Sequence, residues 1–216
     1  MLSASSLPPA EARANGAWDF IDSIYQQKGN AKLLAHMNAS AGFHIWTVNE
    51  PKLTEDGMLD FSNIIIRASP LYRQFFENLG ATFIIQPAPE VYTSLERGVI
   101  NANAYPVLGY ASFGWDRFTR YRVDPSYFRM DVLISMNLDA YNALSPEARA
   151  IIDEVSEEFE QKSWEETAAL RDRLAQEMID KGQQVVEMHG AGRERFLQMA
   201  AEASWQRMEA RDPTHI

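Results

Sequence analysis

The sequence predicts an α/β fold whose strands run mostly parallel, and two observations point to it. Short apolar runs at 64–66, 83–85 and 99–100 alternate with two helix-like segments that each begin with a proline. Strand, helix, strand, helix, strand at this spacing is typical of a parallel sheet with crossover helices. The chain also has 216 residues, 46% hydrophobic and 23% charged, which suits one large or two modest globular domains.

The first half of the chain contains most of the predicted strands. A helix is expected over 9–28 and a strand over 43–48. The apolar face of that helix would consist of Ala17, Phe20, Ile21 and Ile24. The two crossover helices begin at Pro70 and Pro89, and Gly98 ends the second of them.

The second half predicts long helices. A strand at 131–136 precedes a strong helix start at 145–147, where a serine N-cap is followed by proline and glutamate. This helix is expected to run nearly to Gly182, and a strand at 185–188 and a helix at 193–208 follow it. Its apolar stripe would comprise Ile151, Ile152, Val155, Phe159, Leu170, Leu174 and Met178.

The charge of the chain is acidic but unevenly distributed. Lysine and arginine number 20 against 30 acidic residues, a net charge of -10, which argues against nucleic-acid binding. Segment 147–180 holds eleven acids and four bases, so it contributes -7 of that charge. The ordinary interpretation of this segment is a solvated helix face.

Several classes of chemistry have no sequence signature here. Cysteine is absent, which excludes disulfides and thiolate nucleophiles. The histidines lack metal-ligand spacing, and no Walker, G-x-S-x-G or G-x-G-x-x-G motif occurs. No apolar stretch reaches about 18 residues, and residues 1–9 do not resemble a secretion signal. The residues therefore favour a binding protein without metal or cofactor over an enzyme.

Arg67 is the most informative candidate binding residue. It ends the first parallel strand and precedes the helix start at Ser69-Pro70. Open α/β sheets bind ligands at the carboxyl ends of their strands, where a guanidinium and helix amides together suit a carboxylate. The alternative is a surface arginine or an internal ion pair.

Four further residues are candidates at the same sheet edge. Asn103 and Tyr105 alternate along the third strand of the parallel set, and they either contact ligand or build the turn before Pro106. His44 lies in the strand at 43–48, where a packing role is the usual alternative. Trp115 belongs to an aromatic cluster that either lines a pocket or fills the core.

Taken together, these motifs resemble the solute receptors of tripartite ATP-independent periplasmic (TRAP) transporters. The matching segments are NIIIRASPLY at 63–72, LGA at 79–81, Pro87, EVYTSL at 90–95, GVI at 98–100 and Pro106. The resemblance implies a periplasmic-binding-protein type II fold, with two lobes, parallel or mixed sheets and long C-terminal helices. It also implies a periplasmic receptor that binds an organic acid and delivers it to membrane permease subunits. The family's carboxylate-clamping arginine falls on Arg67.

Three positions depart from the family pattern. His44 stands where members often have a second ligand-facing arginine, Tyr105 replaces the asparagine of a Glu-Asn-Pro motif, and Ala88 replaces a phenylalanine wall. The site would therefore have one fewer positive charge, at His44, and a smaller side chain, at Ala88. These two differences indicate a bulky or aromatic monocarboxylate as the ligand rather than a small dicarboxylate.

The resemblance also predicts the domain organisation. Segments 1–41 and 131–170 would form the remainder of the first lobe, and 42–130 and 171–216 would form the second lobe with the ligand-binding edge. The family's opening strands are missing, so the first lobe is expected to be incomplete, with strand 131–136 short of neighbours and open to homodimer formation. The alternative is a truncated cytoplasmic α/β domain with an enzymatic or purely interaction role.

Overall fold

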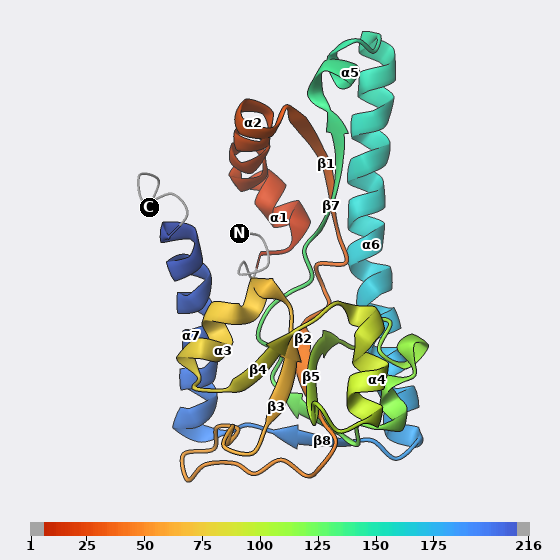
Figure 1. Ribbon diagram of the computed structural model, residues 1–216. Coiled ribbons are helices and arrows are strands. Elements are labelled where there is room, and N and C mark those ends of the chain that lie inside the picture. Colours follow the sequence, from red (N-terminus) through yellow and green to blue (C-terminus); the bar gives the residue numbers. More distant parts are fainter. Residues whose placement is uncertain (1–6, 211–216) are drawn as a thin grey trace. The chain divides into compact units, whose positions relative to one another are not determined.

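The computed structural model describes residues 7–210, which fall into two compact units. The large unit comprises 42–128 and 171–210, and the small unit comprises 7–41 and 129–170. Both contain helices and strands, so the predicted α/β class is confirmed (Figure 1).

A six-stranded mixed sheet forms the centre of the large unit. Its spatial order is β4 (Thr82–Ile85), β3 (Ile65–Ala68), β5 (Ala102–Pro106), β2 (Phe43–Thr47), β6 (Tyr121–Asp124) and β8 (Gln184–Glu187). β3 runs parallel to β4 and β5, as the strand and helix spacing predicts. β2 is antiparallel to both β5 and β6, and this makes the sheet mixed.

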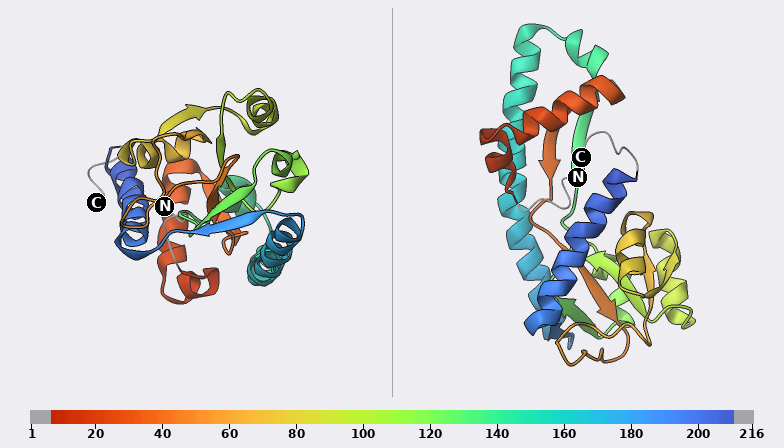
Figure 2. Two further views of the ribbon diagram at one scale, coloured as in Figure 1. Left: turned by 90° about the horizontal axis from the view of Figure 1, so that it is seen from below. Right: turned by 90° about the vertical axis from the view of Figure 1, so that its left-hand side faces the viewer.

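Helices cover both faces of this sheet. They are η2 (Pro70–Tyr72), α3 (Arg73–Asn78), η3 (Ala88–Glu90), α4 (Val91–Glu96), η4 (Ala111–Phe113), η5 (Trp115–Arg117) and α7 (Gly190–Glu209). On one face, Phe75 and Phe76 of α3 pack with Phe196 of α7 and with Ile66. α4 and the last turns of α6 (Pro146–Asp180) lie on the other face (Figure 2), and their side chains pack with Trp46. The unit is therefore a three-layer sandwich with one apolar cluster on each side of the sheet.

The third parallel strand begins later than expected. Residues 99–100 form a turn rather than a strand, and Val99 is 49% exposed. Gly98 adopts φ 68, and the amides of residues 99 and 100 then bond back to the carbonyl of Ser94. Asn101 anchors the new strand start, because its side chain accepts from the Ile65 amide at 2.7 Å and donates to the Asn63 carbonyl at 2.8 Å.

The small unit is built on a two-stranded antiparallel sheet. Its elements are α1 (Pro9–Ala14), α2 (Ala17–Gly29), β1 (Ala31–Met37), β7 (Val132–Asn137), α5 (Leu138–Asn142) and the part of α6 (Pro146–Asp180) up to residue 170. The predicted strand 131–136 is confirmed as β7, and within the described residues it pairs only with β1, a strand the sequence did not predict. Val132 and Ile134 of β7 are 42% and 39% exposed.

The predicted helix over 9–28 is in fact two helices. Gly16 adopts φ 81 between α1 and α2, and the side chain of Asn15 accepts a hydrogen bond from the Ala17 amide. Glycine takes this left-handed conformation at little cost, so it separates the two helices. The buried face also differs, because Trp18 is 3% exposed whereas Phe20 is 64% exposed.

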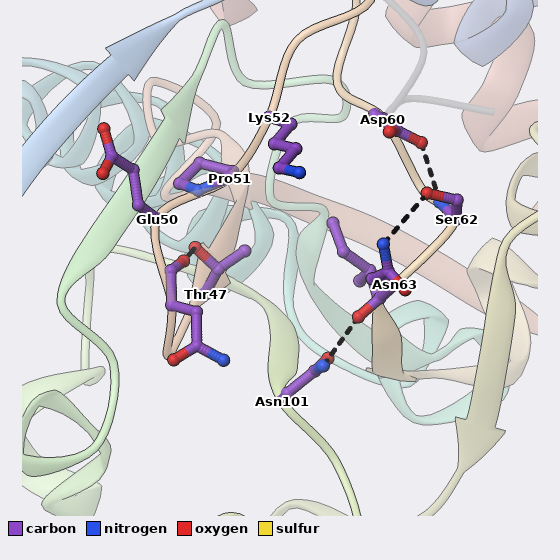
Figure 3. Close-up of a pocket in the computed structure, with 10 residues that line it drawn as sticks. Thr47, Glu50, Pro51, Lys52, Asp60, Ser62, Asn63 and Asn101 are labelled. Atoms are coloured by element: carbon purple, nitrogen blue, oxygen red, sulfur yellow. Dashed lines mark hydrogen bonds between the residues drawn. The ribbon is translucent and has the colours of Figure 1, made fainter.

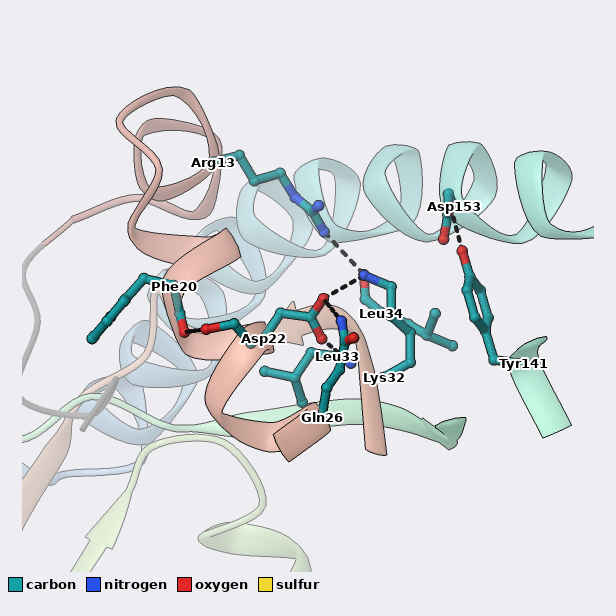
Figure 4. A network of polar contacts seen from close by, with 10 residues as sticks. Arg13, Phe20, Asp22, Gln26, Lys32, Leu33, Leu34, Tyr141 and Asp153 are labelled. Carbon is teal, nitrogen blue, oxygen red and sulfur yellow. Dashed lines mark hydrogen bonds and ion pairs between the residues drawn. The ribbon is translucent and has the colours of Figure 1, made fainter. Parts of the chain in front are cut away.

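A buried polar network organises the small unit (Figure 4). Asp22 of α2 accepts from the Leu33 amide at 2.8 Å and from Lys32 Nζ at 2.5 Å. Glu160 of α6 is 1% exposed and accepts from Arg13 Nε and from the His36 amide, at 2.5 and 2.6 Å. The acidic side of α6 is therefore not a purely solvated face.

The long helix α6 ends at Asp180, close to the predicted end at Gly182, but its apolar stripe is only partly buried. Met178 is 3% exposed, whereas Ile151, Val155 and Phe159 are 60%, 55% and 50% exposed. The predicted stripe is thus wrong for the first half of the helix in the described structure.

Titration of His36 is expected to make the stability of the small unit depend on pH. Burial lowers the pKa of His36 below its ordinary value of 6.5, and the charge of Arg129 lowers it further. The charges of Asp131 and Glu160 raise the pKa, but by less than burial lowers it. The unfolded chain therefore binds this proton more strongly, and stability is expected to fall as the pH drops below about 6.5.

Thermal unfolding of the wild type and of His36→Gln tests this, followed from about pH 7.5 to about pH 5.5. The variant should lose less stability over this interval, whatever its stability at the upper end. An equal loss in both proteins would assign the pH dependence to other groups.

Candidate functional site

Arg67 lies on β3 at the carboxyl end of the parallel strands, as predicted. It is 6% exposed, and its Nε donates to the backbone carbonyl of Gln86 at 2.9 Å. Among residues 7–210, no carboxylate forms a salt bridge with its guanidinium. The internal ion pair considered as an alternative is therefore not found in this part of the chain.

Three phenols lie near enough to Arg67 to influence its charge. Burial lowers the pKa of Arg67, while Tyr72, Tyr105 and Tyr127 lie close enough to raise it. Burial in turn raises the pKa of Tyr72 and Tyr127, so these phenols are un-ionised at neutral pH. They offer hydrogen bonds but no compensating charge, and the buried guanidinium keeps its full positive charge.

Asn103 is the cross-strand neighbour of Arg67 on β5. It is 0% exposed, and neither its amide nitrogen nor its amide oxygen has a hydrogen-bond partner that meets the usual geometric limits. The amide nevertheless lies near the Tyr110 hydroxyl. Burial raises the pKa of Tyr110, and interactions with Thr119 and Asn103 partly offset this rise. The Asn103 amide therefore retains hydrogen-bonding capacity on the sheet face that it shares with Arg67.

Tyr105 and Trp115 form an aromatic wall beside Asn103. Tyr105 follows Asn103 by two residues on β5, so the two side chains share one face of the strand. Its ring meets Trp115 edge to face, with centroids 4.9 Å apart. Trp115 is 1% exposed and stacks on Phe113 at 4.4 Å, so it supports Tyr105 from within the core.

His44 lies opposite Tyr105 on β2 and is joined to an acid. Its Nδ1 is 2.6 Å from Asp124 Oδ1, and Asp124 also accepts two hydrogen bonds from Arg122, at 3.0 and 2.9 Å. Burial raises the pKa of Asp124, but the hydrogen bonds and charges of His44 and Arg122 lower it more. The Asp124 carboxylate thus contacts both His44 and Arg122. Arg67, in contrast, has no carboxylate partner among the described residues.

Three residues of this site were not expected from the sequence. Gln86 positions Arg67 through its backbone carbonyl, and Tyr72 and Tyr127 lie near enough to raise the pKa of Arg67. Tyr72 lies two residues after Pro70, in the predicted helix start that follows Arg67. Its proximity to Arg67 was therefore foreseeable from the sequence. Gln86 directly follows the predicted parallel strand at 83–85, so its place at the same sheet edge was foreseeable as well. Tyr127 carries no such signal, because chain folding alone brings it near Arg67.

A pocket of about 110 Å³ lies at the other end of the parallel strands (Figure 3). Thr47 ends β2 on one side of it, and Ile64 and Asn101 precede β3 and β5 on the other. Its polar groups are largely paired among themselves, for example the Ser62 amide with Asp60 and the Asn101 amide with Asn63. It contains none of the predicted site residues.

Two other features are absent from the described part of the chain. No three or more histidine, aspartate or glutamate side chains among residues 7–210 form a group that could hold a metal ion. Over the same residues, no helix is sufficiently long and apolar to traverse a bilayer.

Comparison with known proteins gives one family and one fold. A family model described as bacterial extracellular solute-binding protein, family 7, matches residues 12–212. A TRAP periplasmic solute binding protein from Desulfovibrio desulfuricans, with bound sn-glycerol-3-phosphate, superposes with a TM-score of 0.81 at 17% identity, over 97% of this chain and 67% of that one.

Two further solved structures share the fold. The TRAP periplasmic solute binding protein from Haemophilus influenzae RdAW, with bound L-gulonate, gives a TM-score of 0.75 at 17% identity, and 90% of this chain covers 62% of it. That from Rhodoferax ferrireducens, with bound malonate, gives 0.76 at 16% identity, and 94% of this chain covers 65% of it. The chain thus spans less than two thirds of both proteins, and the similarity confirms the predicted receptor fold.

Proposed function

Because this chain belongs to the bacterial extracellular solute-binding proteins of family 7, we propose that it binds an organic acid through Arg67 for delivery to the membrane permease of a TRAP transporter. It would act outside the cytoplasm and would bind the acid without catalysing a reaction. A bound acid would shift the receptor population toward the conformer that it contacts best, and the permease would recognise that conformer.

The observation that carries this proposal is the buried, uncompensated charge of Arg67. A guanidinium removed from water loses solvation free energy, and a buried cation is normally paired. Arg122 on the same sheet follows that rule, because Asp124 binds it through two hydrogen bonds. Arg67 has its Nε fixed by Gln86 and no acidic partner among the described residues. A ligand carboxylate would supply the missing negative charge with matching geometry.

The other side chains favour an acid with one carboxylate. His44 shares Asp124 with Arg122, so Arg67 is the one candidate cation of this site without an acid beside it in the described structure. Asn103 would bond a polar group of the ligand, and Tyr105, backed by Trp115, would pack against its apolar or ring portion. The L-gulonate bound to the Haemophilus influenzae protein has one carboxylate, which supports this class, whereas the malonate relative shows that the fold also serves dicarboxylates.

A thermal-shift screen tests the proposed function. Mono- and dicarboxylic acids, aromatic and aliphatic, are added to the purified chain together with sn-glycerol-3-phosphate. An acid at about 100 times its Kd should stabilise the protein by about 2.7 kcal/mol and be recovered unchanged. No stabilisation by any compound would favour an interaction role, and consumption of the acid would indicate an enzyme.

A further inference from the structure

A second anion site is suggested by a basic pocket in the large unit, away from the edge that holds Arg67. Its volume is about 190 Å³, and it is lined by η5, by the residues before β6 and by the link between α6 and β8. Since about 15 Å³ of such space holds one water, the pocket has room for a polyatomic ion.

The charges around this pocket are unbalanced. Arg117, Arg120 and Lys181 line it against a single acid, Asp116, so three positive charges minus one negative leave a net of +2. Within the described residues none of these three bases has a carboxylate within 4.0 Å, although acids outnumber bases by 30 to 20 in the chain. By contrast, the exposed base Arg171 pairs with Asp172 at 2.7 Å. The absence of a partner for three neighbouring bases points to an external anion.

The fold holds these bases together. β6 and β8 pair in parallel from Tyr121 and Gln184 onward, and the Gln184 amide donates to the carbonyl of Arg120 at 2.9 Å. This pairing fixes Arg120 beside the link that carries Lys181. The last carbonyls of α6 would repel an anion, but the amides of Gly182 and Gln183 already bond two of them, at 2.8 and 3.1 Å.

Gln183 provides a second, independent indication. It lines the pocket and is 8% exposed, and neither its amide nitrogen nor its amide oxygen has a hydrogen-bond partner. A buried amide without partners is destabilising, and a turn of this side chain toward the pocket would let an occupant that both accepts and donates satisfy the amide. A hydrogen phosphate group does both, because it has anionic oxygens and one hydroxyl.

We propose that this pocket, formed by Arg117, Arg120, Lys181 and Gln183, binds inorganic phosphate as the hydrogen phosphate ion. The site is distinct from the carboxylate site proposed at Arg67, and it does not depend on it. Phosphate bound there would join η5, the start of β6 and the end of α6.

Calorimetric titration with inorganic phosphate, at constant ionic strength maintained with chloride, tests this proposal. The wild type should show one saturable phosphate site in this pocket, and Arg120→Gln and Lys181→Gln should each weaken it about tenfold, because each removes a charge-assisted hydrogen bond. All three bases are exposed, so the variants should fold. Lys52→Gln makes the same charge change at the pocket of Figure 3 and should leave phosphate binding unchanged.

Arg67→Met separates this site from the acid site. Phosphate binding that keeps its affinity in Arg67→Met but is weakened about tenfold in Arg120→Gln supports the proposal. Binding that is lost in Arg67→Met and kept in Arg120→Gln and Lys181→Gln would overturn it, since the phosphate would then occupy the sheet edge. A wild type without saturable phosphate binding would overturn it as well, and that second result would not bear on acid binding at Arg67.

Discussion

Arg67→Met should weaken binding of the cognate acid by about 2 to 5 kcal/mol, equivalent to a loss of roughly 30- to 4000-fold in affinity. The methionine keeps much of the side-chain volume in a position that is 6% exposed but removes the charge that a buried carboxylate needs. Isothermal titration calorimetry with the acid identified by the thermal-shift screen measures the loss.

Two matched variants make this result interpretable. Arg67→Lys retains the charge but not the planar fork, and it should bind with intermediate affinity. Arg97→Gln removes an exposed charge just after α4 in the same unit and should leave binding within a factor of about two. If Arg67→Met binds the acid as tightly as Arg97→Gln, the guanidinium does not contact the ligand.

Glu160→Ala should reduce the free energy of unfolding by about 3 to 5 kcal/mol, because it leaves Arg13 without its buried counter-charge. Glu160 accepts from Arg13 Nε and from the backbone amide of His36, so the substitution also leaves that amide unsatisfied. Urea unfolding followed by circular dichroism measures the change.

Glu158→Ala is the control for this substitution. It removes an exposed acid from the same helix, two residues earlier, and should change stability by less than about 0.5 kcal/mol. Equal effects of the two substitutions would mean that the Glu160 ion pair contributes nothing beyond helix propensity and surface charge.

The sequence predicted the parts of the fold that rest on local signals. Proline and serine at the helix starts, together with short apolar runs, were sufficient for β3, β4 and the helices between them, because crossover connections require a parallel arrangement. The start of α6 was predictable for the same reason, since the Ser145 hydroxyl accepts a hydrogen bond from the Ala148 amide.

Features that depend on distant partners escaped prediction. β1 contains alanine, lysine and histidine among its seven residues, and it is a strand because β7 pairs with it about a hundred residues later. Glu160 belongs to a run of acidic residues whose sequence predicts a solvent-exposed helix face. Its burial is favourable only because Arg13, 147 residues away in the sequence, pairs with it. Local propensity carries no information about such pairings.

The candidate site shows the same division. Arg67 was predictable because its strand and the following Pro70 set its place at the sheet edge. The environment of Arg67 was only partly predictable. Gln86 directly follows the neighbouring parallel strand β4, but no spacing rule connects Tyr127 with Arg67. Likewise His44 was recognisable as a polar strand residue, whereas its link to Asp124 required the antiparallel pairing of β2 with β6.

The most direct test of the central claim is a crystal structure of the protein with the acid identified by the screen, in which the distances from the ligand oxygens to the Arg67 guanidinium are measured. The predicted result is a carboxylate bound bidentately, with two nitrogen to oxygen distances of about 2.7 to 2.9 Å. A ligand bound elsewhere, with Arg67 paired to an acid of the protein itself, would contradict the proposed role of Arg67.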